Sequence, residues 1–225
     1  EYEKLTAVIE KFFWDEEKGA YIDSFTSGRR NVTRHANIFA ILFSVADEKK
    51  QEKILKNVLE NDEIPAITTP YFNFFELDVL CRMGKLTEVL DKIRSYWGGM
   101  LDLGAVTFWE EYDPSVPKEE QYDMYGDHFG KSLCHAWAAS PIYFLAKYFA
   151  GLDLVNKDGV TYILKPQMQY FTELDCTLPV GSNGVVRLVW DGEILEITPN
   201  VDGGILELGE QKLSLVRGET RRVKI

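Results

Sequence analysis

Apolar and polar residues in the first 150 positions recur with the period of helices. In residues 2–13 the apolar side chains lie at steps of three, three, one, three and one: Tyr2, Leu5, Val8, Ile9, Phe12 and Phe13. This spacing is typical of a helix with one apolar face. Trp14 and Asp15 end the pattern, and a polar turn over residues 16–23 leads into an extended segment. We therefore expect a helix followed by a turn and a short strand.

Five further helices are predicted from the same period. Residues 33–46 are apolar nearly all round, so we expect a buried helix capped by Asn31 or Thr33. His35, near its start, fits a helix-end histidine better than a sugar contact. Of the other four helices, the first begins at Asp47 in a highly charged segment, and the second runs from Pro70 to Gly84. The third runs from Leu86 to Trp97 and is expected to end at Gly98 and Gly99. The last runs from Ser132 to Phe149, with a kink or a restart at Pro141.

From Thr161 the period changes to two. Short alternating segments lie at 162–164, 185–190, 194–197, 205–208, 213–215 and 223–225, with glycine-rich turns between several of them. Short strands with turns every 8 to 12 residues are typical of an antiparallel β-sandwich. We expect an α plus β protein with two domains. About six helices fill residues 1–152, and a small antiparallel β-sandwich fills residues 153–225.

The amino-acid composition indicates which kinds of molecule the protein is expected to bind. The chain has 225 residues, 45% of them hydrophobic, as expected for a soluble globular protein of one or two domains. Its formal charge is −11, and the basic pairs Arg29-Arg30 and Arg221-Arg222 are short. Nucleic acids bind to clustered Lys and Arg, so we expect no nucleic-acid partner.

No apolar run approaches the roughly 18 residues that span a bilayer, so we expect no membrane partner. The sequence also shows no leader peptide, but it begins at Glu1 rather than Met. A removed leader would make the protein secreted or periplasmic, and its absence would make it cytoplasmic. The sequence does not decide between these compartments.

Cysteine usage indicates neither disulfides nor a metal site. Cys81, Cys134 and Cys176 are far apart, so we expect three free thiols. His128, His135 and Asp127 do not follow the spacing of zinc ligands. We therefore expect no metal and no cofactor.

The candidate chemistry lies in the loop from Gly104 to Pro114, where Trp109 is followed by Glu110 and Glu111. Glycosidases place a carboxylate beside an apolar wall, because the sugar stacks on the wall while the carboxylate acts on water or on the anomeric carbon. A solvated glutamate pair beside a tryptophan that fills the core would give the same residues. The loop continues to Gly130, longer than the roughly 12 to 15 residues usual for loops without a function.

The loop resembles the Gly-Ala-Thr-Thr-x-Trp-Glu motif of glycoside hydrolase family 78, the α-L-rhamnosidases. The resemblance implies that Glu110 is the general base of an inverting mechanism. The stretch from Ser132 to Trp137 is similar to the family's Ser-x-x-His stretch, which implies that His135 contacts the sugar. The chain departs from the motif at Val106, where Thr is usual, and at Glu111, where Arg is common.

Two other segments add to the expected fold and the expected sugar site. Residues 189–197 resemble the Trp-x-Asp-Gly hairpin of the sandwich that follows the catalytic barrel in this family. Tyr71, beside Pro70 at the start of a predicted helix, is expected to wall the sugar site together with Trp109. The candidate site is thus Glu110 as the catalytic residue, with Trp109, His135 and Tyr71 as substrate contacts.

The resemblance implies a glycosidase that releases terminal α-L-rhamnose from glycans or glycosides. It covers the C-terminal half of an (α/α)6 barrel and the following sandwich. No residue here matches the family's general acid, which we expect upstream of Glu1, although Asp113, Asp123 and Asp127 lie near Glu110 in sequence. The chain alone is then expected to be inactive. Half a barrel would expose apolar helix faces, so a homodimer is also expected.

Two other functions remain open at this stage. The chain could be a carbohydrate-binding or scaffold module without catalysis, whose sugar binding would not depend on Glu110 or His135. It could also belong to another (α/α)6 glycosidase family that acts on a different sugar. The tryptophan–glutamate loop and the C-terminal sandwich favour the rhamnosidase interpretation over this third one.

Overall fold

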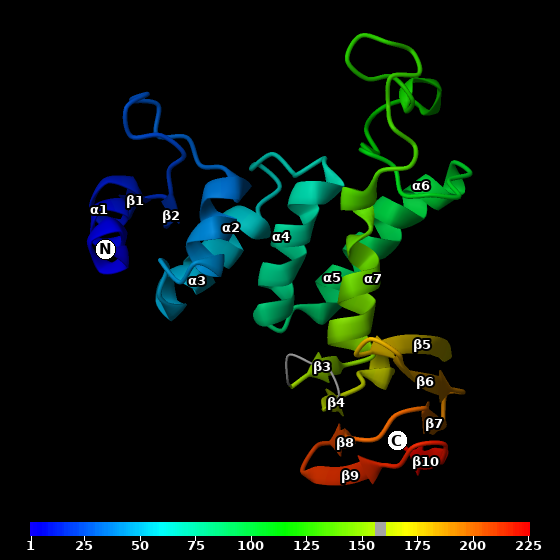
Figure 1. Ribbon diagram of the computed structural model, residues 1–225. Coiled ribbons are helices and arrows are strands. Elements are labelled where there is room, and N and C mark those ends of the chain that lie inside the picture. The colour runs from blue at the N-terminus through cyan, green and yellow to red at the C-terminus, as the bar shows by residue number, and fades with distance from the viewer. Residues whose placement is uncertain (156–160) are drawn as a thin grey trace. The chain divides into compact units, whose positions relative to one another are not determined.

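The computed structural model describes residues 1–155 and 161–225. The chain divides into two compact units, Glu1–Ser140 and Pro141–Ile225. The first unit is helical with long loops, and the second consists mainly of strands (Figure 1). The domain boundary after residue 152 stays a prediction. The compact units divide earlier, because Ala146 and Ala150 of the last helical run pack in the core of the second unit.

The first unit contains five helical runs. They are α1 (Tyr2–Phe13), α2 (Arg34–Leu42), α3 (Glu48–Ile54) continued by η1 (Leu55–Leu59), α4 (Pro70–Arg82), and α5 (Leu86–Lys92) continued by η2 (Ile93–Trp97) and α6 (Gly98–Asp102). Two short strands, β1 (Trp14–Asp15) and β2 (Ala20–Tyr21), follow α1 as an antiparallel pair. Short 3-10 helices, η3 (Lys118–Glu120) and η4 (Ala136–Ala138), lie in the last loop.

The predicted helix starts near Thr33, Asp47 and Pro70 agree with the structure. Thr33 caps α2 by accepting a hydrogen bond from the backbone N–H of Ala36, and Asp47 caps α3 by accepting one from Lys50. Pro70 is the first residue of α4. A buried ion pair of 2.8 Å between Arg34 and Glu76 joins α2 to α4 inside the helical core.

Three predicted helix boundaries are wrong. Helix α2 ends at Leu42 rather than at residue 46. The run that starts at Leu86 does not end at Gly98 and Gly99 but continues to Asp102. The ring of Tyr112 packs against Gly99, where a Cβ atom would collide with it. The close packing of this ring offsets the cost of roughly 1 kcal/mol that a glycine adds in a helix. The third error is at Ser132, which lies in neither a helix nor a strand, and the last helical run begins only at Ser140.

The last helical run is α7 (Ser140–Phe144) continued by η5 (Leu145–Phe149), and all of it but Ser140 belongs to the second unit. The restart near Pro141 is confirmed, and the described part of the chain contains six helical runs. The strands are β3 (Leu152–Leu154), β4 (Tyr162–Leu164), β5 (Leu174–Val180), β6 (Gly184–Trp190), β7 (Ile194–Pro199), β8 (Gly204–Leu208), β9 (Gln211–Leu215) and β10 (Arg221–Lys224), with the 3-10 helix η6 (Met168–Tyr170) between β4 and β5.

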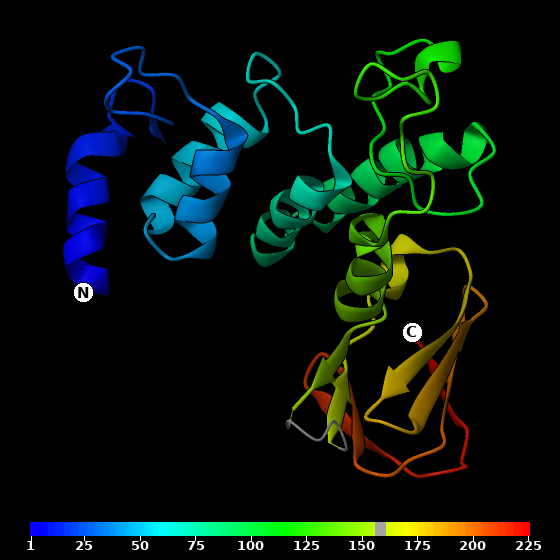
Figure 2. The same ribbon diagram turned by 45° about the horizontal axis from the view of Figure 1, so that its top comes forward.

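These strands form two sheets around one core (Figure 2). Their orders are β10-β7-β6-β5 and β3-β4-β8-β9, and buried side chains from both sheets meet, as expected for a sandwich. The hairpin expected over residues 189–197 is present, with Trp190 opposite Leu195. Strand β5 was not predicted, because Pro179 interrupts its pattern. The proline is tolerated because β5 lies at a sheet edge.

The sequence had suggested purely antiparallel sheets, but one pair of strands is parallel. Strands β4 and β8 are parallel neighbours, with Ile163 opposite Ile205. The chain between them passes through β5, β6 and β7 of the other sheet. Such a long connection permits a parallel pair, whereas a hairpin turn does not.

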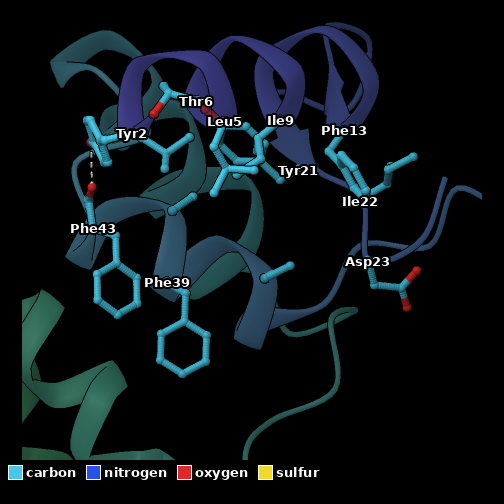
Figure 3. A pocket seen from close by; sticks show the side chains of 13 residues that line it. Tyr2, Leu5, Thr6, Ile9, Phe13, Tyr21, Ile22, Asp23, Phe39 and Phe43 are labelled. Carbon is cyan, nitrogen blue, oxygen red and sulfur yellow. Dashed lines mark hydrogen bonds between the residues drawn. The ribbon is translucent and has the colours of Figure 1, made fainter.

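An apolar groove of about 460 Å³ lies between α1 and α2 (Figure 3). Tyr2 closes one end by donating a hydrogen bond of 2.7 Å to the carbonyl oxygen of Phe43. Leu5, Ile9 and Phe39 are among the lining residues. No residue of α1 is buried. Within residues 1–155 and 161–225, no helix combines the length and the apolar character that a bilayer span requires.

Candidate functional site

Two extended segments of the first unit lie side by side and bring the candidate residues together. The backbone N–H of Glu110 donates to the carbonyl oxygen of Ser132 at 2.9 Å, and that of His135 donates to Phe108 at 2.8 Å. The hydroxyl of Thr107 also donates to the carbonyl oxygen of Leu133. The backbone groups of Ser132 and His135 thus form hydrogen bonds with the neighbouring segment, whereas in a helix they would bond within the helix itself. They place Glu110 next to His135.

Glu110 is only 6% exposed, and both oxygens of its carboxylate have partners. Oε1 accepts a hydrogen bond of 2.9 Å from the hydroxyl of Tyr125, and Oε2 accepts one of 3.1 Å from the backbone N–H of Ser132. Nδ1 of His135 lies 3.8 Å from Oε2. Burial acts to raise the pKa of Glu110, but the two hydrogen bonds and the charges of His135 and Lys131 outweigh it and leave the pKa below its usual 4.5. Glu110 is therefore ionised at neutral pH, as a general base must be.

Exposed rings lie beside this carboxylate. The ring centroid of Trp137 lies 4.1 Å from that of His135 and 5.5 Å from that of Tyr71. The indole N–H of Trp137 donates to the backbone oxygen of Glu110 at 3.3 Å. Trp137 is 43% exposed and Tyr71 is 44% exposed. Their ring planes are tilted by 42° to each other, so together they form an angled, partly exposed aromatic surface near the carboxylate, which suits a sugar ring.

The structure places Trp109 differently from the other candidate residues. Its side chain is only 3% exposed, and its ring packs edge to face on Tyr122 at 5.6 Å. Trp137 and Tyr71, rather than Trp109, present exposed rings near Glu110, and the sugar contacts of Trp109 and Tyr71 stay predictions. Trp109 stabilises the loop that carries Glu110.

Sequence reasoning missed Trp137 and Tyr125 as site residues. Trp137 lies in the stretch that identified His135, but its direction depends on the 3-10 helix η4, which the pattern does not reveal. Tyr125 lies fifteen residues after Glu110 and reaches it through a backbone conformation with φ of 55°. Only Asn, Asp and Gly commonly adopt such a φ, so no propensity signals this contact.

Two of the three acidic residues that follow Glu110 in sequence have local side-chain partners. Asp123 lies 2.6 Å from Nδ1 of His128, and Asp113 accepts hydrogen bonds from the backbone N–H and the hydroxyl of Ser115. These contacts stabilise the loop and identify none of the acidic residues as a general acid.

In the part of the chain that the structure describes, the residue types that usually bind metal ions do not cluster. No group of three His, Cys, Asp or Glu side chains is placed there to hold a metal ion. The three cysteines are free thiols, with Cys81 buried, Cys134 exposed and Cys176 half-buried.

Comparison with known families identifies the helical part. Residues 1–149 match the family model of the bacterial alpha-L-rhamnosidase six-hairpin glycosidase domain. The chain belongs to this family. The predicted family resemblance is thereby confirmed. A search of curated proteins found no match.

Solved rhamnosidases share the fold. A rhamnosidase from Klebsiella oxytoca with rhamnose bound is 31% identical over 65% of this chain, with a TM-score of 0.57. The family 78 rhamnosidase of Bacillus sp. GL1 is 24% identical over 92% of the chain, with a TM-score of 0.73. An alpha-L-rhamnosidase from Dictyoglomus thermophilum is 20% identical over 93%, with a TM-score of 0.64.

These structures confirm the α plus β class, with a partial helical toroid followed by a β domain. The chain spans 27%, 22% and 23% of the lengths of the Klebsiella, Bacillus and Dictyoglomus proteins, respectively.

Proposed function

We propose that this chain supplies the general base of an inverting glycosidase that releases terminal α-L-rhamnose. One observation carries the proposal: a nearly buried, ionised Glu110 lies beside His135 and an exposed tryptophan, Trp137. An inverting base must take a proton from water at a fixed position next to the sugar. The hydrogen bonds to both oxygens of Glu110 hold the carboxylate in one orientation.

Each neighbour has a role in this proposal. Trp137 and Tyr71 stack against the apolar face of the sugar, and the imidazole of His135 forms a hydrogen bond with a hydroxyl group. Trp109 keeps the loop folded. The family match and the rhamnose bound to the Klebsiella protein support rhamnose as the sugar. The general acid, which an inverting enzyme places about 6.5–9.5 Å from the base, is not assigned among these residues.

Replacement of Glu110 by Gln tests the proposal. Gln keeps the size of the side chain but cannot accept the proton from water. We expect hydrolysis of a chromogenic α-L-rhamnoside, by the protein that carries these residues, to fall by about 10²- to 10⁴-fold, with rhamnose binding nearly unchanged. Glu111→Gln removes the adjacent charge and should leave the rate close to that of the unmodified protein. Equal rates for Glu110→Gln and the unmodified protein would remove Glu110 from the role of base.

Carbohydrate binding without hydrolysis is the second candidate function. The exposed rings of Trp137 and Tyr71 favour it, because such rings bind sugars without any catalytic group. In that case the chain would bind rhamnose, Trp137→Ala would weaken the binding, and Glu110→Gln would change nothing. The same assays thus separate the two functions.

We also propose that the chain associates with a second copy of itself through the apolar groove between α1 and α2. Tyr2, Leu5 and Phe43 are all exposed there, and Val8 adds to the exposed apolar face of α1. Contiguous exposed apolar surface commonly marks an interaction site. The groove includes no residue of the loop with Glu110, so this association would leave the sugar site open.

A further inference from the structure

A row of aromatic rings leads away from Glu110 along the first unit. Beyond Trp137 and Tyr71, the ring of Tyr71 contacts that of Phe72 at 5.2 Å, and Phe72 contacts His35 at 4.5 Å. Phe72 is half-buried and His35 is exposed. A pyranose and a benzene ring each have six ring atoms, so a row of several rings is longer than one sugar. The row can therefore contact more than the sugar next to Glu110.

The elements that carry this row share one side of the helical unit. His35 lies in the first turn of α2, Tyr71 and Phe72 lie in the first turn of α4, and Trp137 lies in the loop before α7. Figure 1 shows the N-terminal ends of α2 and α4 on the same side as the loop of residues 104–139. The row therefore runs across the loop side of the unit.

A polar hollow of about 890 Å³ begins where the row ends. His35 lines it, together with amide side chains of Asn31, Asn57 and Asn61 and the hydroxyl-bearing Thr33. Amides, imidazole and hydroxyl groups offer both donors and acceptors, which is what a ligand with many hydroxyl groups requires. The hollow thus differs from the apolar groove of Figure 3, whose lining is mainly aliphatic and aromatic.

The charges of the hollow favour a neutral ligand. Its cationic lining residues are Lys18, Arg34 and Lys56, and its anionic ones are Glu17, Asp23 and Glu63. The three positive side chains do not outnumber the three negative ones, and Arg34 is moreover paired with Glu76, so the hollow has no excess of positive charge. An anionic ligand such as a phosphate or a uronic acid would need an excess of positive charge. A neutral polyhydroxyl ligand needs none.

We propose that the hollow beside His35 is a second sugar-binding subsite, joined to the Glu110 site by the aromatic row. The ligand is then a neutral oligosaccharide whose terminal rhamnose lies at Glu110 and whose next sugars follow Tyr71 and Phe72 towards His35. This inference rests on the proposed function for the place of the terminal sugar. It revises the interpretation of His35 as a helix-end histidine without a sugar contact.

The test compares the binding of a short and a long sugar. Calorimetric titration of the chain with L-rhamnose, and with a neutral tetrasaccharide that ends in α-L-rhamnose, gives two dissociation constants. We expect the tetrasaccharide to bind at least about tenfold more tightly, a difference of about 1.4 kcal/mol. His35→Ala should remove most of this difference and leave rhamnose binding unchanged. His35→Gln, which keeps a donor and an acceptor but loses the ring, should fall between the two.

Phe43→Ala is the matched control, since it removes an exposed ring at the other end of the same helix. It should change neither dissociation constant. Equal binding of both sugars by the unmodified chain, or a tetrasaccharide preference that persists in His35→Ala, would overturn the subsite. Tetrasaccharide binding that depends on His35, without rhamnose binding, would support the subsite and contradict rhamnose recognition at Glu110. Binding of neither sugar would contradict both proposals.

Discussion

The hydroxyl of Tyr125 donates a hydrogen bond of 2.9 Å to Oε1 of Glu110, although the ring of Tyr125 is 81% exposed. Tyr125 reaches the carboxylate from a left-handed backbone conformation with φ of 55°. Gly130 packs against the carbonyl oxygen of Met124 in the same loop, where a Cβ atom would collide. The loop is therefore shaped so that an exposed phenol can hold a buried carboxylate.

Tyr125→Phe should raise the pKa of Glu110. The hydroxyl stabilises the ionised carboxylate and so holds its pKa down, and its removal shifts the pKa upward. A general base works only when it is deprotonated, so activity is lost as the pH falls through this pKa. The acid limb of kcat/KM should therefore move to higher pH, with little change at neutral pH.

The measurement is the pH dependence of rhamnoside hydrolysis, or an NMR titration of the Glu110 carboxyl carbon. Tyr2→Phe is a suitable control, because the hydroxyl of Tyr2 binds the backbone oxygens of Phe43 and Ser44 and contacts no part of the Glu110 loop. An acid limb that stays in place in Tyr125→Phe would show that the phenol does not tune Glu110.

Trp137 and Trp109 should respond in opposite ways to replacement by Ala. Trp137 is exposed and Trp109 is buried, so only Trp109→Ala leaves a cavity. Trp109→Ala should lower the free energy of unfolding by about 3–5 kcal/mol. Trp137→Ala should change stability much less and weaken rhamnose binding by roughly tenfold, if ring stacking contributes about 1.4 kcal/mol.

Urea denaturation and sugar titration of the two variants check this assignment. Trp137→Phe keeps a flat ring and should retain most of the affinity, although it loses the N–H that binds the backbone of Glu110. Normal stability of Trp109→Ala combined with weakened rhamnose binding would instead favour the sugar contact first expected for Trp109.

The adjacent glycines Gly98 and Gly99 offer a paired test of the long helical run. A Cβ atom at Gly99 would collide with the ring of Tyr112, whereas one at Gly98 would meet no atom within 4 Å. Gly98→Ala should stabilise the protein by about 0.5–1 kcal/mol, because alanine favours a helix interior. Gly99→Ala should destabilise it by about 1–3 kcal/mol through overpacking. Equal effects of the two changes on the denaturation midpoint would contradict the packing of Tyr112 on Gly99.

Self-association through the apolar groove should depend on Leu5. Leu5→Glu places a charge among the apolar residues between α1 and α2, and burying that charge in an interface is costly. We expect the chain to dimerise in light scattering at micromolar concentration and the variant to be monomeric. Leu101→Glu, which alters an exposed leucine outside the groove, should leave the dimer intact. A monomeric unmodified chain would contradict the proposal.

Local patterns in the sequence determined much of this protein. The period of apolar residues predicted the helix over 2–13, and local capping chemistry predicted Thr33 and Pro70 as starting residues. Such signals act within a few residues along the chain, so they can be read without the fold. The motif around Glu110 indicated the family, which the match over residues 1–149 confirmed.

Tertiary contacts decided the rest. Which tryptophan is exposed beside Glu110, the helix that continues through Gly99 and the parallel pairing of β4 with β8 all depend on residues far apart in sequence. Periodicity shows that a position is buried, but not which partner buries it. That partner is set by long-range packing, in which Tyr112 covers Gly99 and Tyr122 covers Trp109.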